Sequence, residues 1–235
     1  MKNLTAKEFL KMLSLLKSKE ELKNVKRFYR DEDASNKFLG IRMANLFSLA
    51  KEFKDILLLE IENLLESEYY EARMGAVSIM DFQARSGKVS DERKKQLFDL
   101  YIRRHDRINN WDLVDRSAPY VVGGYLFDKP RNILYNLAKS KNVWERRTAI
   151  VSTYFFIRQG QINDTFKIAE ILVNDKHDLI QKAVGSWIRE AGKKDILVLV
   201  EFLDAHASSM PRVMLRYAVE KLDKKTRDAY LKSKN

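Results

Sequence analysis

Hydrophobic residues recur along most of the chain at the three- and four-residue spacing of an α-helix. One stripe runs from Phe9 to Leu16 and another from Ile56 to Leu64. Residues at this spacing fall on one side of a helix, where they can be buried together. No segment sustains the alternation of apolar and polar residues that a half-buried strand needs. The pattern therefore predicts about a dozen helices and no sheet.

Residues typical of helix ends divide these stripes from one another. A side-chain oxygen before a stripe can cap the free N–H groups of a helix, and a glycine after it can end the helix. The segment from residue 30 to residue 37 is rich in Asp, Ser and Asn and is expected to be an exposed loop. The predicted start signals are Thr5, Ser90, Asn163 and Asp178, and the predicted stop signals are Gly160 and Gly192.

A small alanine beside a β-branched or other apolar residue recurs in several of the predicted helices. The copies are centred on Ala76, Ala149, Ala183 and Ala218, at separations of 73, 34 and 35 residues. Because the first separation is about two periods, a further copy is expected near position 112. A mid-thirties repeat of paired helices is typical of a HEAT-like α-solenoid, an all-α fold whose stacked pairs leave a concave surface. We expect one solenoid domain over residues 1–235.

Composition and charge limit which partners and which cellular compartment are expected. The 235 residues include 8 Gly, 3 Pro and no Cys, which excludes disulfides and thiolate chemistry and fits a reducing cytoplasm. No apolar run approaches the length of about 20 residues that spans a bilayer, so no membrane association is expected. The net charge of +11 favours a polyanion such as nucleic acid, although a basic surface that serves only solubility is an equally simple explanation.

The expected copy near position 112 carries the candidate chemistry. Trp111 and Asp115 are four residues apart, so on a helix that begins near Asn110 they share one face. Asp112 would lie in the first turn, where the helix dipole stabilises a carboxylate, and Pro119 would end or kink the helix early. A core tryptophan and a capping aspartate would give the same spacing.

This stretch resembles the central motif of the AlkD-type DNA alkylation repair glycosylases, and the resemblance covers nearly the whole chain. We expect membership of that family. The family is a HEAT-like superhelix that holds duplex DNA in a concave basic cleft and hydrolyses the N-glycosidic bond of N3- and N7-alkylated purines without metal or cofactor. The segments that carry the resemblance are Asn109–Ala118, Phe38–Arg42, Trp144–Ile150, Asn174–Ile180 and Met210–Ala218.

The resemblance implies a role for each matching residue. Trp111 would pack against the deoxyribose of the lesion, and Asp115 would lie beside the anomeric carbon. Either Arg147, which we favour, or Arg146 would bind a backbone phosphate, and Arg189 would bind another. The remaining contact on the lesion side would be Tyr29 or Phe28, and the sequence leaves this choice open. The expected partner is double-stranded DNA that contains alkylated purines, bound by a monomer.

One departure from the family pattern bears on activity. The family usually has a second tryptophan facing the lesion directly after a helical glycine, where this chain has Ser186 after Gly185. Trp187 is displaced by one residue, about 100° around the helix. It would then belong to the core, unless a local distortion turns it into the cleft. The favoured function is therefore a glycosylase, and the alternative is a non-catalytic binder of damaged or distorted DNA.

Other functions have less support in the sequence. The three histidines, at positions 105, 177 and 206, lack the spacing of metal ligands, and no Gly-rich phosphate loop is present, so neither a metal nor a nucleotide cofactor is expected. A solenoid that binds only proteins is the third hypothesis, for which the sequence offers no recognisable groove.

Overall fold

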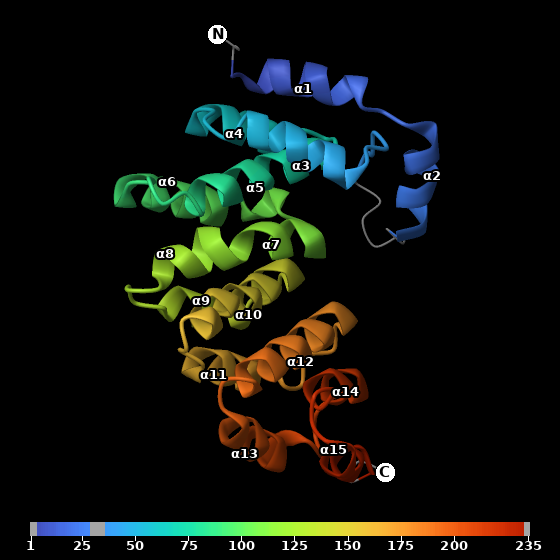
Figure 1. The fold of residues 1–235 in the computed structure, drawn as a ribbon, viewed down its shortest axis with the longest axis vertical. Helices are drawn as coiled ribbons and strands as arrows, with labels where there is room; N and C mark the ends of the chain where they lie inside the picture. The colour runs from blue at the N-terminus through green and yellow to red at the C-terminus, as the bar shows by residue number, and fades with distance from the viewer. Residues whose placement is uncertain (1–3, 29–35, 233–235) are drawn as a thin grey trace. The chain divides into compact units, whose positions relative to one another are not determined.

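The fold is all-helical throughout the part of the chain that is described. The structure is a computed structural model that describes residues 4–28 and 36–232, with the side chains of the first range described as far as Val25. Within these ranges the backbone forms helices and one isolated bridge, between Lys37 and Tyr69. The elements, labelled in Figure 1, are α1 (Ala6–Leu15), α2 (Lys19–Phe28), α3 (Met43–Glu52), α4 (Leu58–Leu65), α5 (Tyr70–Ala84), α6 (Asp91–Arg103), the 3₁₀ turn η2 (His105–Arg107), α7 (Trp111–Ala118), the π-helical turn η3 (Pro119–Gly123), α8 (Gly124–Leu126), α9 (Asn132–Ala138), α10 (Val143–Arg158), α11 (Asn163–Leu172), α12 (Asp178–Gly192), α13 (Ile196–His206), α14 (Arg212–Ala218) and α15 (Lys224–Lys232).

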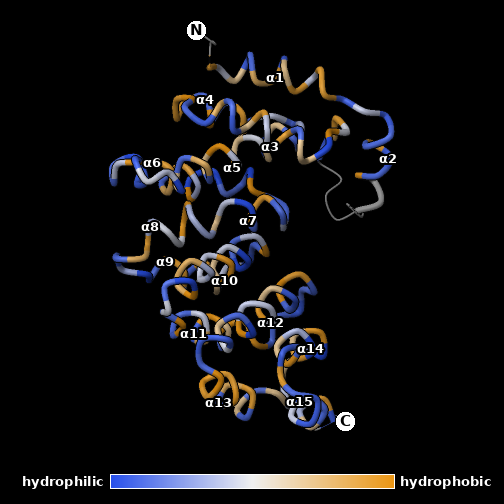
Figure 2. Tube along the Cα trace, in the orientation of Figure 1, coloured by the Kyte–Doolittle hydropathy of each residue, from blue (hydrophilic) through white to orange (hydrophobic). Residues whose placement is uncertain are grey.

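Most of the predicted helix ends are found within one residue of their expected positions. The Thr5 hydroxyl accepts from the backbone N–H of Glu8, and Ser90 caps α6 in the same way, as predicted. Gly160 adopts a φ of +81° directly after α10, a conformation that favours glycine. Asn163 and Asp178 are the first residues of their helices rather than the caps. Figure 2 shows that most of the helices carry both hydrophilic and hydrophobic residues, as the stripes require.

The chain divides into two compact units, residues 1–121 and 122–235. In the first unit α5 packs against α3, α4 and α7, while α1 packs against both α3 and α4. In the second unit α12 packs against α10 and α14, and α9, α11 and α13 pack behind these helices. Each unit is thus built of two layers of helices around a hydrophobic core, as expected of a helical repeat. A single domain over the whole chain remains a prediction.

The four alanines of the predicted repeat each lie within a helix. Ala76, Ala149, Ala183 and Ala218 are all buried, in α5, α10, α12 and α14. The expected additional copy is α7, in which the buried residue at the matching turn is Ser117. The alanines of the predicted repeat thus all lie in buried positions of helices, and the repeat period itself stays a prediction.

A buried carboxylate holds the turn that precedes α3. Both oxygens of Glu71 are within 3.0 Å of the backbone N of Leu39, and Oε1 also accepts from the N–H of Gly40 at 2.8 Å and of Ile41 at 3.4 Å. Gly40 has a φ of +75°, and a Cβ atom there would lie 2.5 Å from the backbone oxygen of Ser18. Only glycine fits this turn without strain.

Candidate functional site

The helix that carries Trp111 and Asp115 begins where the sequence predicts. Asn110 has extended backbone angles, and its side-chain oxygen accepts from the N–H of Trp111 at 2.6 Å. Asp112 lies in the first turn and accepts from the N–H of Leu113. Both short polar side chains thus satisfy N–H groups that a helix start leaves open.

Trp111 and Asp115 lie one turn apart on the accessible side of α7. The Trp111 side chain is 40% exposed, although a tryptophan is usually core, and Asp115 is partly exposed. The opposite side of the helix is buried and includes Leu113, Val114 and Ser117. An indole and a carboxylate are therefore presented together, and neither is sealed in the interior.

Arg73 fixes the segment that leads into α7. Its side chain is almost fully buried, and one terminal nitrogen donates to the side-chain oxygens of Asn36 and Asn109, the latter at 3.3 Å. The other terminal nitrogen donates to the backbone oxygens of Ser67 and Glu68. The guanidinium group thus ties two loops to the residues immediately before Trp111.

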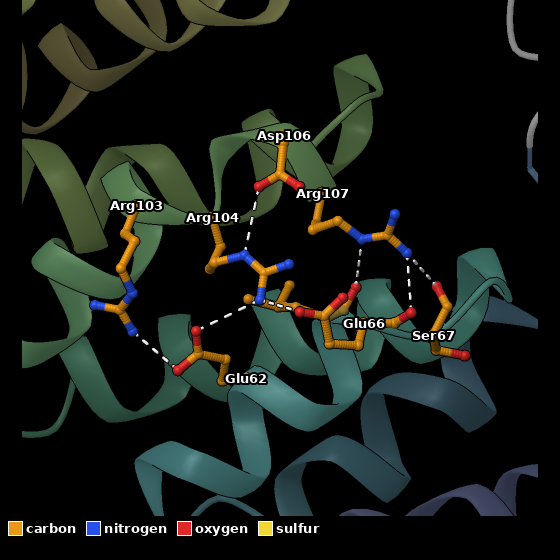
Figure 3. A network of polar contacts seen from close by, with 8 residues as sticks. Glu62, Glu66, Ser67, Arg103, Arg104, Asp106 and Arg107 are labelled. Carbon is orange, nitrogen blue, oxygen red and sulfur yellow. Dashed lines mark hydrogen bonds and ion pairs between the residues drawn. The ribbon is translucent and has the colours of Figure 1, made fainter.

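A second network holds the 3₁₀ turn upstream of the same helix (Figure 3). Arg107 donates through Nε to the Leu65 backbone oxygen at 3.0 Å and through Nη2 to those of Glu66 and Ser67. Arg104 forms ion pairs with Glu66 and Glu62, and its hydrogen bond lowers the pKa of the Glu66 carboxyl below the ordinary value. These polar contacts fix η2 to the end of α4. The start of α7 is therefore fixed both by this network and by Arg73.

Arg116, next to Asp115, anchors α7 to α5 and α3. Its guanidinium pairs with the fully buried carboxylate of Asp81 at 2.8 Å and donates to the Ser78 hydroxyl at 3.1 Å. The group also lies between two rings, 5.0 Å from the Phe47 centroid and 4.9 Å from that of Phe82. Burial raises the pKa of Asp81 above its ordinary value, and Arg116 partly opposes that rise. Sequence reasoning missed this cluster because its members come from three helices.

The backbone changes from α- to π-helical geometry directly after α7. Pro119 ends α7 as predicted, but the chain continues as η3 and then α8 instead of leaving the helix. A proline cannot donate to the preceding turn, and a π-turn is one way to continue after that missing bond. π-turns are frequent at functional sites.

The two candidate phosphate ligands of α10 are both engaged within the second unit. Arg147, which the sequence favoured, is 7% exposed and donates to the Leu179 backbone oxygen at 2.6 Å. Arg146 is less buried, at 18% side-chain exposure, and pairs with Asp175 at 2.6 Å. Arg146 is therefore the more accessible of the two, and a phosphate ligand would have to share it with Asp175.

The candidate residues of α12 are also partnered. Arg189 pairs with Glu190 at 3.2 Å and with Glu220. Trp187 is half-buried and its ring centroid lies 5.0 Å from that of Tyr154 on α10. Ser186, at the position where the resemblance expects the tryptophan, is partly exposed. This tilted ring contact, with an interplanar angle of 40°, places Trp187 at the contact between α10 and α12.

The remaining candidate residues, and groups that could bind a metal, can be assessed only within the described residues. Phe28 is the last residue of α2, and its side chain and all of Tyr29 lie outside the described residues. No cluster of three or more His, Asp or Glu side chains that could bind a metal occurs in residues 4–28 and 36–232. Among the helices described, none is long and apolar enough to cross a membrane.

Comparisons with known proteins identify the family. The model of the DNA alkylation repair enzyme family matches residues 9–222. The chain belongs to this family. A solved structure titled as a predicted DNA alkylation repair enzyme from Enterococcus faecalis is similar to it, with a TM-score of 0.68 and 18% identity over 88% of this chain and 97% of the other. At that identity the likeness supports the fold. No curated protein matches the chain.

Membership in the DNA alkylation repair family confirms the resemblance found in the sequence and is consistent with a role in repair, with DNA as the partner. The site residues keep the status of predictions. Arg116 and Arg73 join them as residues that hold α7.

Proposed function

We propose that the protein is a DNA glycosylase that hydrolyses the N-glycosidic bond of N3- or N7-alkylated purines in duplex DNA, without flipping the base into a pocket. The observation that carries this proposal is the pair Trp111 and Asp115 on the accessible side of α7, one turn apart. The family match over residues 9–222 supports it.

The residue types suit the reaction. Departure of the base builds positive charge on the deoxyribose, and a neighbouring carboxylate stabilises that charge and orients a water molecule for attack on the anomeric carbon. The water oxygen forms the new bond, the glycosidic bond breaks, and the water proton passes to solvent. An alkylated purine is cationic before cleavage and leaves as a neutral base, so no strong general acid is required. The indole of Trp111 would add a cation–π attraction of about 0.5–2 kcal/mol.

The test is release of 7-methylguanine or 3-methyladenine from methylated duplex DNA. We expect Asp115→Asn to lower single-turnover release by about 100-fold or more, with DNA affinity retained, because it removes the stabilising charge. Asp112→Asn is the matched control, since it removes the same charge from the first turn of the same helix. Absence of base release by the intact protein, or equal loss in both variants, would contradict the proposal.

A second candidate is a non-catalytic binder of damaged or distorted DNA. Two observations favour it: Ser186 occupies the position of an expected lesion-facing aromatic, and the displaced Trp187 packs against Tyr154. This function predicts steeply salt-dependent DNA binding without base loss. Base release by the intact protein would eliminate it, and a flat salt response would eliminate both functions.

A further inference from the structure

A cationic feature of the first unit lies where α3 and α5 end, and none of the residues that the resemblance assigns lines it. It is a pocket of about 700 Å³, which we call the basic pocket. Five basic residues line it against a single acidic one, Asp55. We propose that the basic pocket binds the phosphodiester backbone of nucleic acid, as a contact additional to that at Trp111 and Asp115.

Three of the cations are available to a ligand. Lys51, Lys54 and Lys88, which we call the pocket lysines, are exposed. Within the described ranges none of their ammonium groups takes part in an ion pair or a side-chain hydrogen bond. The other two cations, Arg85 and Arg93, have partners within the protein. Arg85 pairs with Asp81, and its guanidinium carbon lies 3.7 Å from the centroid of the Tyr120 ring.

The fifth cation, Arg93, is held in the pocket lining by hydrogen bonds to neighbouring residues. Its Nε donates to the side-chain oxygen of Gln83 at 2.9 Å, and its Nη2 donates to the backbone oxygen of Ile56. The amide nitrogen of Gln83 donates to the backbone oxygens of Lys54 and Ile56. The loop after α3 is therefore held in place, and the carbonyl oxygens that would repel an anion are already occupied.

One residue of the pocket lining contacts the helix that carries the candidate site, which favours DNA as the occupant. Phe82 lines the basic pocket and also packs against the guanidinium of Arg116, the residue after Asp115. Leu57, which is 71% exposed on the lining, adds an apolar surface that a deoxyribose can contact. Point-charge lysines around an open volume suit a mobile phosphate backbone better than one fixed small anion.

Lysines after a helix also offset the dipole of its C-terminus, and Lys51 lies in the last turn of α3. A purely structural role of this kind affects stability and leaves DNA binding unchanged. The experiment must therefore read DNA binding itself.

The test is the salt dependence of binding to methylated duplex DNA by the triple variant Lys51→Gln, Lys54→Gln, Lys88→Gln. If all three lysines neutralise phosphates, the slope of log K against log salt becomes shallower by about 2.7, at about 0.9 per contact. The matched control replaces Lys167, Lys224 and Lys225, exposed lysines of the second unit, by Gln. In a folded triple variant, an unchanged slope relative to that control overturns the proposal.

A measurement on the unaltered protein covers the case in which the triple variant fails to fold. Acetylation of each lysine is quantified by peptide mass with and without DNA, and DNA is expected to protect the pocket lysines at least fivefold more than the control lysines. Equal protection, or protection by phosphatidylserine vesicles in place of DNA, overturns the proposal. The inference rests on the DNA function proposed above, but the two fail separately: binding through the pocket without base release contradicts only the glycosylase, and base release without pocket protection contradicts only the pocket.

Discussion

The ion pair between Arg116 of α7 and Asp81 of α5 allows a quantitative prediction of stability. Arg116→Met keeps the aliphatic bulk of the side chain but leaves Asp81, which is fully buried, with Arg85 alone as its ionic partner. Removing one member of a buried pair costs about 3–5 kcal/mol. Because Arg85 remains at 2.7 Å and Arg116 is 20% exposed, we expect a loss near the lower end, about 3 kcal/mol in the free energy of unfolding.

The assay is urea denaturation followed by circular dichroism, with Arg103→Met as the matched control. Arg103 is 53% exposed and pairs with Glu62 at 2.9 Å, and surface pairs of this kind contribute less than about 1 kcal/mol. Combining Arg116→Met with Asp81→Asn removes the unpaired buried charge. The double variant should recover about 2 kcal/mol relative to the sum of the two single losses.

The pH dependence gives an independent check on the same pair. Burial raises the pKa of Asp81 above its ordinary value of 3.8, so the folded state binds this proton more tightly than the unfolded state. The contribution of Asp81 to stability is therefore largest at low pH and falls as the pH rises from about 3.8 through the folded pKa. Loss of Arg116 raises that pKa further, so the destabilisation should be larger near pH 7 than near pH 4. A loss that does not vary with pH, or that equals the loss in the Arg103 variant, would refute this reasoning.

Two further substitutions probe the helix contacts and the start of α7. Gly185→Ala should destabilise the second unit by about 1–3 kcal/mol in urea denaturation, because its Cβ would lie 2.4 Å from the Met214 backbone oxygen; an unchanged midpoint would contradict the close approach of the two helices. Arg73→Met should release the Asn109 loop and lower the single-turnover rate of base release by about tenfold while KM for DNA stays within about twofold, because it shifts Trp111 at the reacting sugar and leaves the proposed phosphate contacts in place. A rise in KM at an unchanged rate would show that Arg73 does not act by positioning.

Local features of the fold could be predicted from the sequence, since short-range chemistry determines them. Thr5 and Ser90 cap helices because a side-chain oxygen at that position satisfies free N–H groups, wherever the helix later packs. Trp111 and Asp115 share a face because residues four apart lie one helical turn from each other, and α7 contains both. The π-turn after Pro119 was not predicted, because a proline stop signal does not distinguish an ended helix from a changed helical geometry.

Features that depend on contacts between helices could not be predicted. The resemblance favoured Arg147 over Arg146 as a phosphate ligand, and in the structure Arg147 is the more buried and donates to the distant Leu179. The stack of Arg116 between Phe47 and Phe82 joins residues that are 69 and 34 positions away from it in the chain. No local pattern predicts such a meeting, since it follows from how α3, α5 and α7 pack.

These contacts suggest different roles for the arginines and the pocket lysines. Arg116, Arg146 and Arg189 each pair with a carboxylate, and planar, multiply donating guanidinium groups suit such fixed positions. A phosphate that binds Arg146 or Arg189 must compete with a carboxylate already in place, so those contacts yield less free energy than a free arginine would. The pocket lysines face no such competitor. A basic protein can thus hold most of its guanidinium charge in its own framework while its lysines attract DNA, and the slope of binding against salt should then depend more on the pocket lysines than on the arginines that the family pattern points to.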